Sequence, residues 1–299
     1  MIDIAHVSKS YGKVNALNDL SFKVNEGQLY GLIGPDGAGK TTLFRILTTL
    51  LLPDAGNVSL DGFDVVKDYK AIRKMLGYMP EHFSLYTDLT VEENLNFFAT
   101  VFNTSVQENY YLIKDIYKML EPFKHRKAGD LSGGMKQKLA LSCALIHKPK
   151  ILLLDEPTTG VDPVSRKEFW EMLKHLQTEG LTSLVSTPFL DEAALCDVVA
   201  LVQDGRILSQ DTPQNISKQF PYKLLEIKSE NNYNTLLLLE KYDHKVSVFA
   251  FGNVLHLACE NDVNINEIEQ YLDDHHIDNF SIKPITPSIE DVFMDLMKK

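Results

Sequence analysis

The sequence has no long apolar run, and this absence limits what the chain can be. Its longest apolar stretches, such as Ile151–Leu154 and Leu236–Leu239, are interrupted by acidic residues within a few positions, whereas a membrane-spanning helix needs about 18 to 20 apolar residues. The N-terminus also lacks the basic and then apolar segment of a secretory signal. We therefore expect a soluble chain, for which any work at a membrane requires a partner that supplies the membrane part.

Cysteine and positive charge are also scarce. The three cysteines are far apart and in no metal-binding spacing, which is typical of free thiols in a reducing cytosol: Cys143, Cys196 and Cys259. Acidic residues outnumber basic ones by 41 to 30, giving a net charge of −11. Because nucleic-acid backbones favour basic surfaces, we expect no nucleic-acid partner. With 44% hydrophobic residues in 299, the chain can fill the core of one large domain, or of one large and one small domain.

A glycine-rich segment carries the strongest signal. It fits the pattern G-x-x-x-x-G-K-[ST], which cradles nucleotide phosphates, and consists of Gly34, Pro35, Asp36, Gly37, Ala38, Gly39, Lys40, Thr41 and Thr42. Gln28–Ile33 before it is typical of a buried strand, and Leu43–Leu47 after it of a helix. A glycine turn that binds nothing is the alternative, but the order strand, loop, helix argues against it. The sequence thus predicts that the chain binds a nucleoside triphosphate.

Each part of this segment has a physical role in that prediction. Glycines let successive backbone N–H groups face one anion, and the helix N-terminus adds partial positive charge. Lys40 would reach the β- and γ-phosphates, and the Thr41 hydroxyl would ligate Mg²⁺.

Two acids close the second buried strand. The apolar run Ile151–Leu154 is followed directly by Asp155 and Glu156, and the carboxyl ends of central parallel strands form the ligand edge of a sheet. In a phosphoryl-transfer site the first acid would hold Mg²⁺ and the second would polarise the attacking water, which makes Glu156 the candidate catalytic residue. The alternative is a solvated strand end.

A second anion-binding signal opens a helix that extends to about His147. It consists of Leu131, Ser132, Gly133 and Gly134. A hydroxyl, bare N–H groups and the helix dipole favour an anion at this N-terminus. Two phosphate-reading surfaces on one chain indicate two copies arranged head to tail, each closing the site of the other.

Three further features are ambiguous from the residues alone. Tyr11, near the turn between expected strands at 2–7 and 20–24, could stack on adenine, although an ordinary edge aromatic is favoured. Phe83–Tyr86 could be a coupling surface, although loop packing is the simpler explanation. Metal binding by His275 and His276 is disfavoured, because neighbouring side chains on a helix diverge by about 100°.

The order of motifs resembles the ATPase subunits of ABC transporters over residues 1 to about 215. The resemblance implies an α/β, P-loop NTPase cassette with a RecA-like core, an antiparallel β subdomain and a helical subdomain at about 85–148, together ending near 218. It makes Tyr11 the adenine-stacking aromatic, and it places Asp162 in a loop that meets the partner across a dimer. ATP and Mg²⁺ are the implied cofactors. The implied location is cytoplasmic, peripheral on the inner face of the cell membrane.

The resemblance also implies partners. These are an integral-membrane permease subunit and a second ABC ATPase subunit, or a second copy of this chain, in a head-to-tail dimer. Residues 222–299 read as a small α+β domain in the order βαββαβ, which is ferredoxin-like. The segment Thr286–Phe293 is similar to the C-terminal extension of drug- and polysaccharide-type exporters, which favours export over import.

Two positions depart from the family pattern. Glu81 stands where most members carry glutamine; as a carboxylate it can still ligate the metal. Pro188 stands where the family has a switch histidine that contacts the γ-phosphate, and proline has no side-chain donor. We expect Thr187 to cap a helix and Pro188 to occupy its first position.

These observations leave three functional hypotheses. The first is the ATPase subunit of an ABC exporter, which hydrolyses Mg-ATP to drive a membrane partner. The second is a hydrolysis-impaired ATP-binding half of an asymmetric pair, acting structurally or as a regulator; Glu156 favours the first and Pro188 the second. The third is a soluble ABC ATPase that acts on chromosomes or ribosomes. The chromosome type would need a long heptad insertion and the ribosome type two tandem cassettes, and the sequence has neither.

Overall fold

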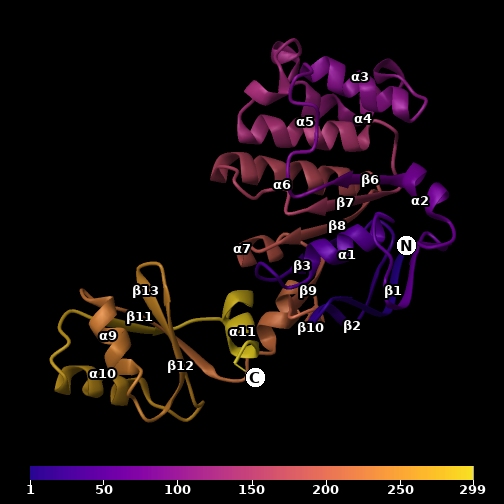
Figure 1. Ribbon diagram of the computed structural model, residues 1–299. Coiled ribbons are helices and arrows are strands. Elements are labelled where there is room, and N and C mark those ends of the chain that lie inside the picture. Colours follow the sequence, from indigo (N-terminus) through magenta and orange to yellow (C-terminus); the bar gives the residue numbers. More distant parts are fainter. Residues whose placement is uncertain (299) are drawn as a thin grey trace. The chain divides into compact units, whose positions relative to one another are not determined.

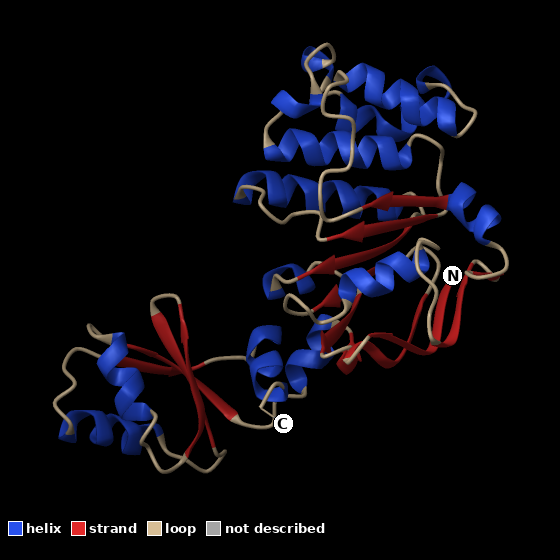
Figure 2. Cartoon of the chain, viewed as in Figure 1, coloured by secondary structure: helices blue, strands red, loops and turns tan. Residues whose placement is uncertain are grey.

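The chain forms two compact units, and the computed structural model describes residues 1–298. The first unit is Met1–Pro213, and the second begins at Gln214. Figure 1 labels most elements of both units along the chain, and Figure 2 colours helices and strands differently. Within residues 1–298, no helix combines the length and the apolar character needed to cross a bilayer.

A six-stranded sheet in the order β10-β9-β3-β8-β7-β6 forms the centre of the first unit. Its strands are β3 (Leu29–Ile33), β6 (Leu76–Met79), β7 (Ile151–Asp155), β8 (Thr182–Thr187), β9 (Val198–Gln203) and β10 (Arg206–Asp211). All pairs are parallel except β10 with β9. Every residue of β3, β7 and β8 is buried, as expected for apolar strands covered on both faces. Because β8 lies between β3 and β7, the loops that follow these strands meet at one edge.

A second, antiparallel sheet has the order β2-β1-β4-β5. Its strands are β1 (Ile2–Tyr11), β2 (Val14–Val24), β4 (Ala55–Leu60) and β5 (Phe63–Asp64). The expected strands at 2–7 and 20–24 were too short. Irregularities in the β1–β2 register break the simple alternation beyond Ile4, so the sequence pattern ended before the pairing did. Tyr11 consequently lies on a strand, paired with Val14, and not in the turn.

Helices surround the central sheet. They are α1 (Lys40–Leu47), α2 (Tyr69–Met75), α3 (Val91–Val101), α4 (Val106–Tyr117), α5 (Gly133–Leu145), α6 (Pro163–Thr178) and α7 (Leu190–Ala193), with 3₁₀ turns at Glu121–Phe123 and Ala128–Asp130. Figure 1 shows α3, α4 and α5 grouped beyond the β6 edge of the sheet. A capping box between Thr90 and Glu93 stabilises the start of α3.

The start of α7 differs from the expectation. The helix begins at Leu190 with Phe189 as its N-cap residue, so the expectation of Thr187 as the cap and Pro188 at the first helical position was wrong. Thr187 ends β8, and its hydroxyl donates to Glu192 at 2.5 Å while accepting from the Phe189 N–H at 3.1 Å. This buried glutamate, five residues along the chain, sets the path of the backbone where a local capping rule predicted an earlier helix.

Helix α8 (Pro213–Lys218) begins at the last residue of the first unit, and the rest of it belongs to the second unit. The second unit also contains a four-stranded antiparallel sheet in the order β12-β13-β11-β14. Its remaining elements are β11 (Lys223–Lys228), α9 (Asn232–Leu239), β12 (Lys245–Phe251), β13 (Val254–Cys259), α10 (Ile265–Asp274), β14 (Ser281–Pro284) and α11 (Ile289–Leu296). From β11 to β14 this is the βαββαβ order, with the strand arrangement of a ferredoxin-like fold. Asp291 ties α11 to β13 through His256 Nδ1, at 2.7 Å.

Candidate active site

The glycine-rich loop between β3 and α1 is held by close packing against neighbouring strands. A Cβ at Gly39, where φ is +100°, would lie 2.2 Å from the carbonyl oxygen of Ala16 on β2. A Cβ at Gly34 would lie equally near the carbonyl oxygen of Val202 on β9, at 2.2 Å. Any other residue would force the backbone apart at both positions. The loop is therefore fixed between two strands before any ligand is considered.

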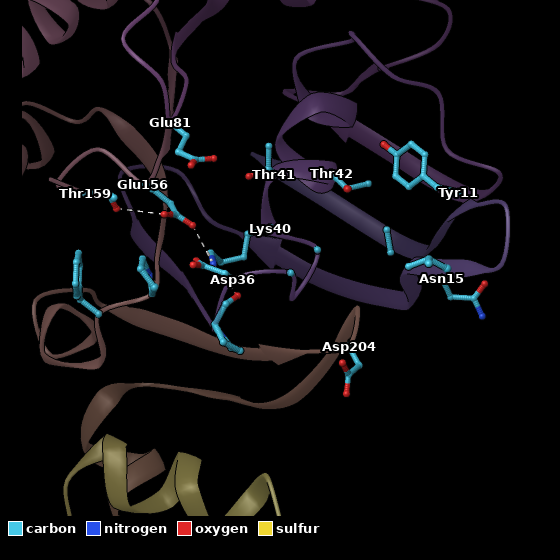
Figure 3. A pocket seen from close by; sticks show the side chains of 17 residues that line it. Tyr11, Asn15, Asp36, Lys40, Thr41, Thr42, Glu81, Glu156, Thr159 and Asp204 are labelled. Carbon is cyan, nitrogen blue, oxygen red and sulfur yellow. Dashed lines mark hydrogen bonds and ion pairs between the residues drawn. The ribbon is translucent and has the colours of Figure 1, made fainter. Parts of the chain in front are cut away.

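Lys40 is the first residue of α1 and is 4% exposed. Its ammonium group donates to the carbonyl oxygens of Gly34 at 2.8 Å and Pro35 at 3.0 Å. It also lies 3.0 Å from Oε1 of Glu156, as Figure 3 shows. This arrangement keeps a positive charge within the loop, where an anionic phosphate would meet it.

Glu156 follows β7, which lies on the other side of β8 from β3, and its side chain meets Lys40 of the glycine-rich loop. Its backbone is in the left-handed region, with φ of +49°, an uncommon conformation for a residue with a side chain. The backbone N–H donates to the carbonyl and hydroxyl oxygens of Ser186, at 3.1 and 2.9 Å. The residue is only 6% exposed, and Oε2 of its side chain accepts a hydrogen bond from the Thr159 hydroxyl at 3.2 Å. The contacts fix both the backbone and the carboxylate.

Asp155 is fully buried beneath the cleft, with 0% exposure. Its Oδ1 accepts from Ser186 Oγ at 2.6 Å, and Oδ2 has no hydrogen-bond partner within the described residues. Burial raises the pKa of this carboxyl, and the hydrogen bonds from Ser186 and Thr41 only partly offset it. The charges of Glu156 and Glu81 raise the pKa further.

This donor set fits a hard divalent cation. An unpartnered carboxylate oxygen of Asp155, the neighbouring Thr41 hydroxyl and the Glu81 carboxylate are all oxygen ligands, which Mg²⁺ prefers. A cation would also relieve the repulsion among the three carboxylates.

Most of the residues expected from the sequence line one cleft of about 860 Å³. Those at its surface are Tyr11, Pro35, Asp36, Gly37, Gly39, Lys40, Thr41, Thr42, Glu81, Glu156 and Pro188. Gly34 and Ala38 are buried in the loop behind that surface. Tyr11 is 46% exposed at the rim, where an aromatic ring is available for stacking.

Sequence reasoning missed several residues of the cleft. They are Val14, Asn15, Ala16, Thr159, Phe189 and Asp204. Asp204 lies in the turn between β9 and β10, and nothing local in the sequence indicates that this turn faces the glycine loop. Thr159 had a usable signal: it lies three residues after Glu156, close enough for a hydroxyl to reach the carboxylate.

The Leu131–Gly134 segment and Asp162 lie outside this cleft. Ser132 caps α5 by accepting from the Met135 N–H at 3.4 Å, and Ser132 and Gly133 are exposed. Asp162 caps α6, and the N–H groups it accepts from, Ser165 first, lower the pKa of its carboxyl. The exposed residues among these, Ser132, Gly133 and Asp162, form a second polar surface outside the cleft.

A strand, a glycine loop and a helix with a buried lysine, facing two acids at the end of a nearby parallel strand, define a P-loop nucleotide-binding cassette. Comparison with known proteins gives the family. The ABC transporter family model matches residues 17–159. The chain is 42% identical to Nod factor export ATP-binding protein I of Burkholderia lata, over 71% of each chain. It is 34% identical to the protein of the same name from a Rhizobium species, over 99% of this chain and 96% of the relative.

The chain therefore belongs to the ABC transporter family, as an ATP-binding cassette. It is also 39% identical, over 94% of its length, to the probable multidrug ABC transporter ATP-binding protein YbhF of Escherichia coli, of which it spans 49%. Solved structures agree. An ATP-binding subunit of an ABC transporter matches with a TM-score of 0.67 and 30% identity, over 74% of this chain and 93% of that one. A dimeric bacterial ABC transporter cassette matches with a TM-score of 0.64 and 28% identity, over 71% of this chain and 98% of that one.

The raised pKa of Asp155 predicts how stability depends on pH. A folded-state pKa above the ordinary value favours the protonated carboxyl, so stability is lost as pH rises from about 4 upward. Asp155→Asn removes the buried charge and is expected to raise the free energy of unfolding at pH 7 by about 1–3 kcal/mol without nucleotide, and the gain should vanish near pH 4. Thermal unfolding from pH 4 to 8 measures this, with the exposed Asp88→Asn as control. A gain that is equal at every pH would contradict it.

Proposed function

We propose that the chain is the ATP-binding subunit of an exporter, which binds and hydrolyses Mg-ATP in a head-to-tail dimer and thereby drives a membrane partner. The observation that carries this proposal is the ion pair of Lys40 and Glu156 in one cleft, with the unpartnered Asp155 oxygen buried next to Glu156. The export function rests on the relatives, whose names include Nod factor export and probable multidrug transport.

In this proposal each group of the cleft has a task. Backbone N–H groups of the loop and Lys40 bind the phosphates, while Tyr11 stacks on the adenine. Thr41, Asp155 and Glu81 would hold Mg²⁺, which would neutralise charge on the phosphates. Glu156 accepts a proton from the attacking water as the water oxygen bonds to the γ-phosphorus and the bond to the leaving oxygen breaks. For this, the Glu156 carboxylate exchanges its contact with Lys40 for one with water.

In the proposed dimer, the second polar surface faces the nucleotide bound on the partner chain. Ser132 and Gly133 are exposed at the N-terminus of the 13-residue helix α5, so their donors are available to the nucleotide bound on a partner chain. Asp162 precedes α6 in the loop after β7 and would meet that partner. The partner is a second copy of this chain or a related ATPase subunit.

A groove in the first unit is suited to the membrane partner. It has a volume of about 390 Å³ between β6, α3 and α5, and Leu85, Phe98 and Phe102 are among its apolar lining residues. Leu85 belongs to the Phe83–Tyr86 segment and follows Glu81 by four residues, so a permease segment seated there would contact the same connection between β6 and α3 that carries Glu81. The chain would then act on the cytoplasmic face of the membrane, held there by the permease.

The second candidate function is the hydrolysis-impaired half of an asymmetric pair. It is favoured by Pro188, which lines the same cleft as Thr159 and Phe189 and has no side-chain donor for a γ-phosphate. In this case the site retains nucleotide, and Ser132–Gly134 complete the active site of a different ATPase subunit.

Pro188→His tests which candidate holds. Supplying an imidazole at the end of β8 is expected to raise the turnover of Mg-ATP by as much as 10²-fold, roughly the value of one transition-state contact, with little change in nucleotide affinity. Phosphate release and nucleotide binding are measured on the purified chain beside Pro188→Ala, which removes the proline without adding a donor. Fast turnover by the unmodified chain, unchanged in Pro188→His, would exclude the impaired half.

A further inference from the structure

We infer that Thr159 is a positioning residue that holds the Glu156 carboxylate during hydrolysis; the inference rests on the proposed role of Glu156 as the base. Within residues 1–298, the side-chain contacts of this carboxylate are Lys40 at Oε1 and Thr159 at Oε2, 3.0 and 3.2 Å away. Figure 3 shows the two contacts on opposite sides of the carboxylate.

These two contacts differ in what a nucleotide does to them. The Lys40 ammonium has three N–H donors, and two are used by the carbonyl oxygens of Gly34 and Pro35. A phosphate bound by the loop takes the third, which now faces Glu156. Thr159 has no competing partner of this kind, because its hydroxyl reaches the carboxylate from the loop that follows β7. It therefore remains to orient Glu156 at the moment when Lys40 is engaged elsewhere.

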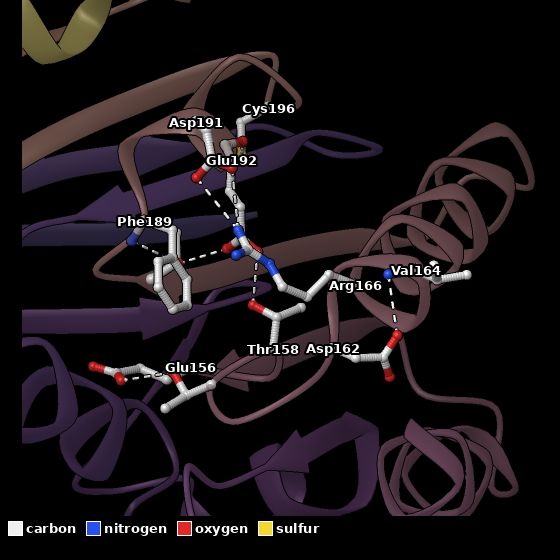
Figure 4. A network of polar contacts seen from close by, with 11 residues as sticks. Glu156, Thr158, Asp162, Val164, Arg166, Phe189, Asp191, Glu192 and Cys196 are labelled. Carbon is white, nitrogen blue, oxygen red and sulfur yellow. Dashed lines mark hydrogen bonds and ion pairs between the residues drawn. The ribbon is translucent and has the colours of Figure 1, made fainter. Parts of the chain in front are cut away.

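Thr159 can perform this role because the neighbouring Thr158 is anchored to a buried glutamate, Glu192. The hydroxyl of Thr158 donates to Oε1 of Glu192 at 2.8 Å, and Arg166 Nε on α6 donates to the same oxygen at 3.2 Å. The other oxygen of Glu192 accepts from Thr187 at the end of β8, at 2.5 Å. Glu192 is 2% exposed, so this buried carboxylate joins three elements, as Figure 4 shows for Thr158, Arg166 and Glu192.

The anchor is costly to disturb. A buried carboxylate that is fully paired and hydrogen-bonded holds its partners in place, since any displaced partner would leave a charge without compensation. The Thr159 N–H also donates to the Glu156 carbonyl at 3.2 Å, so backbone and side chain both fix the distance between the two residues. Pro188 contributes no side-chain donor on this side of the cleft, which leaves the orienting task to Thr159.

The test compares Thr159→Val, which keeps the shape of the side chain but removes its donor, with Thr159→Ser, which keeps the donor. Single-turnover hydrolysis of Mg-ATP with the chain in excess, together with nucleotide affinity, is measured for both. We expect Thr159→Val to lower the hydrolysis rate by roughly tenfold, the value of one hydrogen bond to a charged group, with nucleotide affinity unchanged. Thr159→Ser should restore most of the rate. Thr178→Val, at the exposed end of α6, is the matched control.

A double variant separates this inference from the proposed base. If Thr159 acts through the Glu156 carboxylate, adding Thr159→Val to Glu156→Gln should slow hydrolysis no further. A further tenfold loss in that background, or an unchanged rate in Thr159→Val alone, overturns the inference and leaves the base standing. An unchanged rate in Glu156→Gln, or no hydrolysis by the unmodified chain, overturns the proposed base and the inference together.

Discussion

Replacing Glu156 by glutamine is expected to lower ATP turnover by about 10²–10⁴-fold. Glutamine matches glutamate in size and retains a carbonyl oxygen, but its amide cannot take a proton from water at neutral pH. The backbone at this position is held by Ser186, so the substituted side chain should stay at the cleft. Steady-state phosphate release by the purified chain with Mg-ATP measures the loss.

The same variant should still bind nucleotide, because Lys40 and the glycine loop are untouched. Glu171→Gln is a matched control, since Glu171 lies exposed on α6 and does not line the cleft. Turnover by Glu156→Gln equal to that of this control would show that another group accepts the proton. A loss of both turnover and nucleotide binding would instead indicate that the loop itself had been disturbed.

The sequence was most informative where the chemistry is contiguous. The glycine loop lies between β3 and α1, and its residues are consecutive in the chain, so a short pattern identified the whole loop. Asp155 and Glu156 were equally accessible, because an apolar run that closes on acids marks the end of a buried parallel strand. The family resemblance built on these motifs, and the cassette fold it implied, were confirmed by the relatives and solved structures.

The sequence was least informative where contacts depend on strand order. Asn15 on β2 and Asp204 after β9 reach the cleft because the two sheets bring them beside the glycine loop, and no local pattern encodes that. Similarly, a capping rule placed a helix start at Pro188, whereas the buried Glu192 draws Thr187 into a different contact. Local propensities lose to a buried charge that has to be satisfied.

The second unit illustrates the same division. Its order of strands and helices, βαββαβ, was predicted from the sequence and is the order from β11 to β14. The pairing of His256 with Asp291, which joins β13 to α11 across 35 positions, is a tertiary contact with no signature in either segment. Asp291 also closes a capping box with Ser288, so only this local half of its role could be read from spacing.

Lys40→Ala should have the other large effect, on nucleotide binding and on stability at once. Loss of the buried ammonium removes a charge-assisted contact to the phosphates, worth about 2–5 kcal/mol or roughly 30- to 5,000-fold in affinity. It also leaves the Glu156 carboxylate buried without its ion-pair partner, which should lower the melting temperature. Binding of a fluorescent nucleotide and thermal unfolding measure the two effects.

The double variant of Lys40→Ala with Glu156→Gln separates these two effects, because removing the unpaired charge should restore stability but not affinity. If the double variant regained nucleotide affinity as well, the weak binding of Lys40→Ala would have come from a distorted loop, and the lysine would not be a phosphate ligand.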